Sequence, residues 1–168
     1  GHQRTHTHTH GMGGFERFLL RGSRSTPPKQ GVRGSVLPPQ NNIKVVGGFN
    51  NVNGALSSVE RYDPAAGAWE EAAPMTTARE SHAVAALDGK LYAVGGHNHD
   101  DGSLSSVERY DPAVGAWEAV APMGEERNRP GVAVLDGKLY AVGGHNNDGV
   151  LSSVERYDPA TNAWEAVA

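Results

Sequence analysis

The sequence of 168 residues contains no cysteine, and this absence excludes several kinds of site. Disulfide frameworks, thiolate zinc sites, thiol nucleophiles and cysteine-based cofactors all need a residue that is not there. Lack of cysteine also fits a reducing compartment, and we expect a cytoplasmic protein. No stretch approaches 18 consecutive apolar residues, so the sequence predicts no membrane-spanning helix.

Positive charge is scarce after residue 42. Residues 1–42 hold six Lys or Arg against one acid, whereas residues 43–168 hold nine against 18 acids. Nucleic-acid affinity depends on Lys and Arg neutralising phosphates, so the acidic part is a poor nucleic-acid binder. The change in charge predicts a boundary near residue 42.

Residues 1–42 allow three interpretations. His2, His6, His8 and His10 alternate with other residues and could converge on a transition metal. The Thr-His repeat is also what an alternating C-A dinucleotide tract gives when translated. This end could therefore be untranslated or intronic sequence carried into the gene model, with Met12 as the true start. The Arg-rich, acid-poor composition also resembles a transit peptide. On each interpretation we expect a disordered basic segment, because it can bury too little apolar surface to offset the entropy of ordering.

Residues 43–168 repeat a pattern about every 48 residues. A double glycine recurs at 47–48, 95–96 and 143–144. The sequence Ser-Ser-Val-Glu-Arg-Tyr-Asp-Pro recurs at 57–64, 105–112 and 152–159 and is followed each time by a Trp. The resulting units are 43–75, which is partial, 76–123 and 124–168. A period of this length indicates an array of stacked supersecondary units.

Each unit predicts four short antiparallel strands. In the second unit, two β-runs at 82–87 and 90–94 flank an Asp-Gly turn, which is a strong hairpin pattern. A polar loop at 97–103 follows, then strands at 106–110 and 117–121. In the first unit, residues 35–39 are at best a damaged first strand. Four antiparallel strands at this period make one blade of an all-β propeller, and the chain holds about 2.5 to 3 of them.

Several repeated residues are expected to serve the architecture. Glycine pairs let neighbouring backbones approach closely, so 95–96 are assigned to the fold and not to a phosphate site. The Tyr and Trp residues are expected to pack between blades. Arg79 and Arg127, each four residues after Met in Ala-Pro-Met-x-x-x-Arg, are expected to fix the links between blades by hydrogen bonds.

The double glycine, the Glu-Arg-Tyr-Asp-Pro strand end, the following Trp and the Ala-Pro-Met-x-x-x-Arg link together resemble kelch repeats, most closely those of kelch-like proteins. The resemblance covers residues 43–168. It implies a propeller that follows BTB and BACK domains and recognises substrates for a cullin-RING ubiquitin ligase. Neither of those domains is present here, so cullin is expected as a partner only if the full gene encodes them, and this chain is expected to be a fragment.

The resemblance also implies a partner-binding face, formed by loops between the second and third strands and by the links. The positions carried over are Phe49, Asn51, His97, His99, His145, Asn147, Ser81 and Arg129. Arg129 is the strongest candidate, since a guanidinium binds a carboxylate of an acidic peptide or loop through two parallel hydrogen bonds. The other interpretation is that Arg129 is a solvated loop charge.

We expect a protein-protein interaction module that is not an enzyme and needs no cofactor. The alternative is a kelch scaffold or actin-binding protein, and a metal-dependent kelch enzyme comes after both. His97, His99 and His145 invite a metal interpretation, but loops of this composition are usually solvated, so no metal site is predicted. We expect no nucleic-acid or membrane partner.

Overall fold

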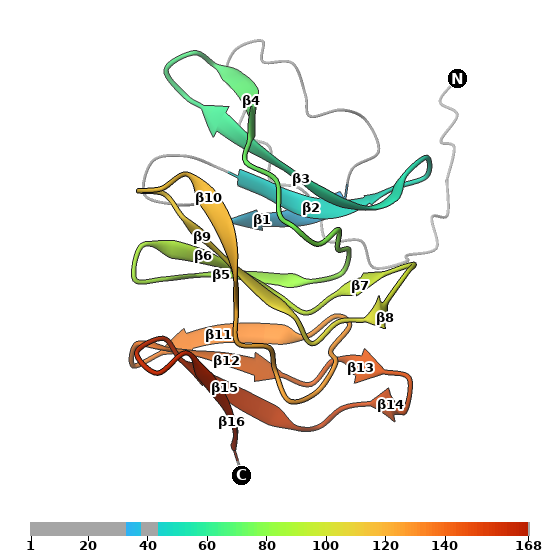
Figure 1. Ribbon diagram of the computed structural model, residues 1–168. Coiled ribbons are helices and arrows are strands. Elements are labelled where there is room, and N and C mark those ends of the chain that lie inside the picture. Colours follow the sequence, from blue (N-terminus) through green and yellow to red (C-terminus); the bar gives the residue numbers. More distant parts are fainter. Residues whose placement is uncertain (1–32, 38–43, 168) are drawn as a thin grey trace, which may run out of the picture.

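The computed structural model describes residues 33–37 and 44–167 and shows an all-β protein (Figure 1). Within these residues no helix has the length and apolar character needed to cross a membrane. The strands form three antiparallel four-stranded sheets, which lie one above another in Figure 1. The predicted partial propeller is therefore confirmed, and each sheet is one blade.

Each blade is named here by its strands. Blade 1 contains β1 (Arg33–Leu37), β2 (Lys44–Asn50), β3 (Gly54–Asp63) and β4 (Ala68–Ala72). Blade 2 contains β5 (Ala83–Leu87), β6 (Lys90–Val94), β9 (Val107–Asp111) and β10 (Ala116–Val120). Blade 3 contains β11 (Gly131–Leu135), β12 (Lys138–Val142), β15 (Val154–Asp158) and β16 (Ala163–Val167). The four strands of a blade pair in chain order.

The predicted Asp-Gly hairpin joins β5 to β6. Asp88 and Gly89 have φ angles of 50° and 74°, and positive φ at both central residues is what a tight hairpin turn requires. The segment 97–103, expected to be a polar loop, instead contains a small hairpin of β7 (His97–Asn98) and β8 (Gly102–Ser103). Blade 3 has the same hairpin, β13 (His145–Asn146) with β14 (Gly149–Val150).

The first blade differs from the expectation. Residues 33–37 lie in the segment for which we expected no fixed fold, yet they form β1 and pair antiparallel with β2. A register shift between Arg33 and Ser35 interrupts this pairing. His2, His6, His8, His10 and Met12 lie outside the described residues.

The core lies between blades. Val46, Val59 and Met75 of the first repeat pack with Leu91, Ala93 and Trp117 of blade 2. A second cluster joins blade 2 to blade 3, where the rings of Tyr92 and Tyr157 meet edge to face at 5.8 Å. Since successive strand residues point to opposite faces, each blade buries one apolar set against each neighbour.

One tryptophan joins blade 2, and one joins blade 3, to the link before it. The indole Nε1–H of Trp117 donates to the carbonyl of Ala73 at 3.0 Å, and that of Trp164 donates to Ala121 at 2.9 Å. These bonds satisfy the one polar atom of a large apolar ring. The expectation that Trp packs between blades agrees with this geometry.

The link arginines are fully buried, as a residue that joins blades requires. Arg79 donates to the carbonyls of Gly95 and Ser106, to the Ser106 hydroxyl and to the Glu108 carboxylate, at 2.8 to 3.1 Å. Arg127 makes the corresponding contacts to Gly143, Ser153 and Glu155, and also pairs with Glu125. The predicted role of Arg79 and Arg127 is confirmed.

The backbone of each link also binds both blades that it joins. On one side, Met75 N–H donates to Ser57 and Arg79 N–H to Leu56, both in blade 1. On the other, the amides of Thr76 and Thr77 donate to the Glu108 carboxylate of blade 2. A link anchored at both ends holds the chain that follows it in a fixed place, and that chain carries the candidate site.

Candidate partner-binding face

The residue after each link arginine pairs with the residue after a double glycine. The amides and carbonyls of Glu80 and His97 exchange two hydrogen bonds of 2.9 Å, and those of Asn128 and His145 exchange bonds of 2.8 and 2.9 Å. Each pairing keeps the register of a blade's first hairpin, β5–β6 or β11–β12, three residues beyond the last pair of that hairpin. We call these two pairs the rungs of blades 2 and 3.

A further bond joins the two blades through the residues that follow Glu80 and Asn128. The amide of Arg129 donates to the carbonyl of Ser81 at 2.9 Å. Both residues have a φ of 54°, a left-handed conformation that costs a non-glycine residue on the order of 1 kcal/mol. The structure therefore brings together Ser81, His97, His145 and Arg129 at one end of blades 2 and 3, the end from which the hairpins β7–β8 and β13–β14 project in Figure 1.

Exposure separates these residues. Arg129 is exposed, while Ser81, His97 and His145 are half-buried. In the described structure the Arg129 side chain makes no hydrogen bond or ion pair, so its guanidinium is available on a backbone that is fixed by the bond to Ser81. An available guanidinium on a fixed backbone suits carboxylate recognition, because little ordering entropy remains to be lost.

The remaining predicted residues lie at hairpin tips. His99 and Asn147 are exposed in the turns of β7–β8 and β13–β14, and Asn51 is exposed in the turn between β2 and β3. No hydrogen bond or ion pair among the described residues joins them to the rungs. Phe49 lies in β2 with 37% of its surface exposed.

One buried side chain shapes the β7–β8 hairpin. The Asn98 amide donates to the Asp101 carboxylate at 2.9 Å and to the carbonyl of Ala78 at 3.2 Å, while its oxygen accepts from the Asp101 amide at 2.7 Å. Asp101 is thus occupied by Asn98. Among the described residues, no three His, Asp or Glu side chains are grouped closely enough to hold a metal ion.

The sequence did not single out Glu80 and Asn128, which lie inside the face. Glu80 places a carboxylate oxygen 3.6 Å from Nδ1 of His97, whereas Asn128 stands at the corresponding position beside His145. The rungs therefore differ in charge. The register of the β5–β6 hairpin could have predicted this position, because residues 80 and 97 lie three residues beyond the pair of residues 83 and 94. The same extension in blade 3 gives Asn128 opposite His145.

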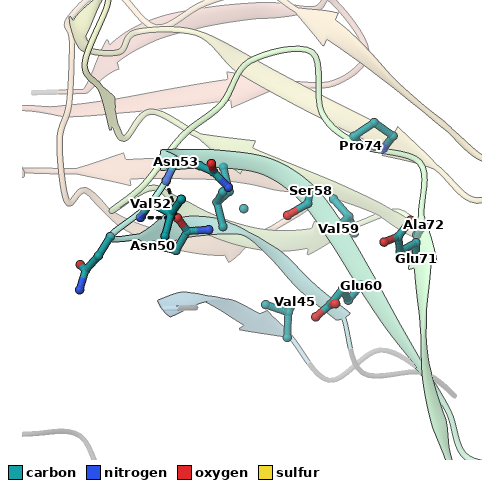
Figure 2. A pocket seen from close by; sticks show the side chains of 13 residues that line it. Val45, Asn50, Val52, Asn53, Ser58, Val59, Glu60, Glu71, Ala72 and Pro74 are labelled. Carbon is teal, nitrogen blue, oxygen red and sulfur yellow. Dashed lines mark hydrogen bonds between the residues drawn. The ribbon is translucent and has the colours of Figure 1, made fainter. Parts of the chain in front are cut away.

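A hollow of about 590 Å³ lies on blade 1 (Figure 2). It is lined by residues of β2, β3 and β4, among them Val45, Ser58, Glu60 and Glu71, and by the turn at 50–53. None of the predicted site residues except Asn51 contributes to it.

Comparison with known proteins agrees with the repeat architecture. The model of the KLHDC2/KLHL20/DRC7 Kelch-repeats domain matches residues 16–168. Kelch-like protein 35 of Homo sapiens is 47% identical over 53 residues, which are 32% of this chain and 9% of that protein. The chain thus spans about a tenth of the length of this curated relative. With three blades joined by buried link arginines and a family match over nearly its whole length, the chain belongs to the kelch-repeat family.

Proposed function

We propose that this chain is a non-catalytic protein-protein interaction module, and that the face formed by the rungs of blades 2 and 3 binds an acidic peptide or loop. Kelch repeats support the coarser statement, that the chain is an interaction module resembling those of kelch-like proteins. The observation that carries the finer one is Arg129, with its exposed guanidinium and its amide fixed to Ser81.

The face offers more than one contact to a partner. His97 and His145 follow the double glycines of adjacent blades and present half-buried imidazoles, and His99 and Asn147 stand at the hairpin tips beyond them. Asn51 occupies the corresponding tip of blade 1. Imidazole and amide groups both donate hydrogen bonds, which suits carbonyl and carboxylate oxygens of an extended segment.

Glu80 refines the chemistry of this partner. Its carboxylate beside His97 makes the blade 2 rung acidic, while Arg129, the residue after the blade 3 rung, makes the blade 3 side of the face basic. A segment with its carboxylate directed toward blade 3 would complement this arrangement, and one with its carboxylate directed toward Glu80 would be repelled. We therefore propose that the face orients its partner as well as binding it.

We further propose that the full protein is cytoplasmic and serves as a substrate-recognition subunit of a cullin-RING ubiquitin ligase. The identity with kelch-like protein 35 and the lack of cysteine support this proposal. The alternative is a scaffold or actin-binding role, which would use the same face without a ligase.

The experiment uses a variant that keeps the fold. Arg129→Gly removes the guanidinium and also relieves the left-handed strain at φ 54°, so its stability should equal or exceed that of the wild type. Partners recovered by affinity purification with the wild-type chain should be lost with Arg129→Gly, and Asp136→Gly, at φ 50° in the β11–β12 turn, is the matched control for the backbone change. Undiminished recovery with Arg129→Gly and with changes at His97 and His99 would show that another surface binds the partner.

A further inference from the structure

Lys44 of blade 1 occupies a position that holds tyrosine in the other two blades. Counted back from the double glycine, Lys44 corresponds to Tyr92 and Tyr140. In each blade this residue pairs across the sheet with an arginine of the third long strand: Lys44 with Arg61, Tyr92 with Arg109 and Tyr140 with Arg156. Blade 1 therefore sets an amine beside an arginine where the other blades set a phenol.

A phenol suits the neighbouring arginine and an amine does not. The carboxylate of Glu118, and after it the phenol of Tyr92, raises the pKa of Arg109, and Arg156 of blade 3 has the corresponding partners. A phenol oxygen accepts a hydrogen bond from a guanidinium, whereas an ammonium only donates and carries the same charge. Like charges directly opposite each other on paired strands destabilise one another. Lys44 therefore faces a cation where its counterparts face a hydrogen-bond partner.

The second neighbour of the Lys44 amine lies on blade 2. Its Nζ stands 4.8 Å from the centroid of the Tyr110 ring, across the boundary between blades 1 and 2. In the described part of the chain, no carboxylate pairs with Lys44, and the nearby Arg61 already binds Glu70. An aromatic face attracts an ammonium, but at a partly exposed site it does so by only about 0.5–1 kcal/mol. The amine is thus held between a ring and a cation without a counterion.

The other two lysines of residues 44–167 are ion-paired. Nζ of Lys90 lies 2.8 Å from Asp111, and that of Lys138 lies 2.5 Å from Asp158. Their side chains are 32% and 30% exposed, and Lys44 is likewise half-buried, so reagents reach the three amines to a similar extent. A neighbouring carboxylate favours the protonated amine, which has no free electron pair with which to react. Lys90 and Lys138 therefore serve as internal references for Lys44.

The surroundings of Lys44 favour loss of its proton. Burial, followed by the nearby Arg61, lowers the pKa of Lys44 below its ordinary value. Desolvation and an adjacent cation are the two conditions that activate a lysine amine as a nucleophile. Lys44 meets both, whereas the paired lysines have a carboxylate instead.

We propose that Lys44 is an acylation site whose amine takes an acyl group from a thioester. The unprotonated Nζ attacks the thioester carbonyl, so that an N–C bond forms and the C–S bond breaks. The sulfur leaves as a thiol with the proton that the nitrogen loses, and the product is an amide. Acylation removes the positive charge of Lys44 and with it the repulsion from Arg61. None of the rung residues takes part, so the proposal stands independently of the partner-binding function.

The test incubates the full chain with acetyl-coenzyme A at a series of pH values from neutral upward and follows each lysine by peptide mass spectrometry. Near neutral pH, the initial rate at Lys44 should exceed the rates at Lys90 and Lys138 by about fivefold or more. The difference should narrow as the pH rises, because the paired amines then lose their protons as well. Arg61→Gln should lower the Lys44 rate by about twofold or more, since it removes the adjacent cation. Arg156→Gln, the corresponding change in blade 3, should leave the Lys44 rate unchanged.

Three outcomes would overturn the proposal. The first is a rate at Lys44 equal to or below the rates at both paired lysines. The second is a Lys44 rate that Arg61→Gln leaves unchanged, because the adjacent cation would then not activate the amine. The third concerns Asp158→Asn, which removes the carboxylate from Lys138 and should raise the rate there. If Lys138 did not respond, acetylation would follow reagent access alone, and the surroundings of Lys44 would not make it a site.

Discussion

Replacing Arg79 with methionine should destabilise the protein strongly. Arg79 has no exposed surface, and its guanidinium donates four hydrogen bonds to Gly95, Ser106 and Glu108. Methionine fills similar space but donates none of them. The carboxylate of Glu108, which is 2% exposed, would keep only its bonds from Thr76 and Thr77.

The magnitude follows from leaving a buried charge without its counterion. Breaking one partner of a buried ion pair costs about 3–5 kcal/mol. A domain of this kind has a total stability of about 5–15 kcal/mol, so the loss is a large part of it. A loss of 3 kcal/mol corresponds to a fall in Tm of roughly 10 °C.

The pair should also confer a pH dependence. Burial opposes ionisation of Glu108, but the hydrogen bonds from Thr76, Thr77 and Arg79 outweigh it and hold the pKa of Glu108 below its ordinary value. A carboxylate with a lowered pKa in the folded state stabilises the fold above its unfolded pKa, and this contribution is lost as the pH falls through the folded value. The difference between wild type and Arg79→Met should therefore shrink in acid.

The assay is urea denaturation followed by tryptophan fluorescence, which reports on the same interface because Trp117 is bonded to Ala73 in the link. Arg109→Met is the matched control. Arg109 pairs with the exposed Glu118, and its loss should cost less than about 1 kcal/mol. In the double variant Arg79→Met/Glu108→Gln, the two losses should fall short of additivity by about 1–3 kcal/mol. If Arg79→Met matched Arg109→Met in stability, the link arginine would not be the residue that joins the blades.

Three further changes have defined outcomes. Gly95→Ala places a Cβ 2.4 Å from the carbonyl oxygen of Arg127, whereas Gly115 has a similar positive φ but open space around it. Gly95→Ala should therefore lower the free energy of unfolding several-fold more than Gly115→Ala does. Trp164→Phe removes the hydrogen bond to Ala121 and should cost about 1 kcal/mol by denaturation, with Trp69→Phe, for which no such bond is found in the described structure, as comparison. Burial, followed by the nearby Arg79, lowers the pKa of His82 to about 4, so the unfolded chain takes up a proton that the folded chain does not between the ordinary His pKa and about 4. As the pH falls through this window, the free energy of unfolding should decrease by up to about 1.4 kcal/mol per pH unit, and His82→Gln should remove that slope.

Much of the fold was predictable because each blade carries the same local rules. The Asp-Gly turn at 88–89 and the proline-ended strands located β5, β6, β9 and β10 within one residue. The link role of Arg79 and Arg127 followed from their fixed spacing. The small hairpin at 97–103 was missed, since two-residue strands have no alternating pattern to read and depend on the buried Asn98 amide. Likewise β1 was expected only as a damaged strand, because its pairing with β2 comes from the register of the sheet and not from its own sequence.

The candidate face was harder to predict for the opposite reason. Identical residues do not have identical surroundings: Val94 is fully buried against blade 3, whereas Val142, its counterpart, has 44% of its surface exposed. Exposure of that kind depends on the neighbouring blade, which no single repeat encodes. The difference between the two rungs could be recognised only once the structure paired residues that lie 17 apart in the sequence, Glu80 with His97 and Asn128 with His145.

The repeats themselves separate structural positions from positions that are free to specialise. The residues that join blades are the same in both links, since Arg79 and Arg127 each meet a glycine carbonyl, a serine and a glutamate. The residues of the face differ at the corresponding places: Glu80 stands where blade 3 has Asn128, and Ser81 where it has Arg129. A position needed for packing must satisfy the same contacts in every blade, whereas a position that contacts a partner meets a different part of that partner in each. The difference in charge between blades 2 and 3 on this face therefore supports our proposal that Glu80 and Arg129 set partner specificity, and the sameness of the links supports a structural role for them.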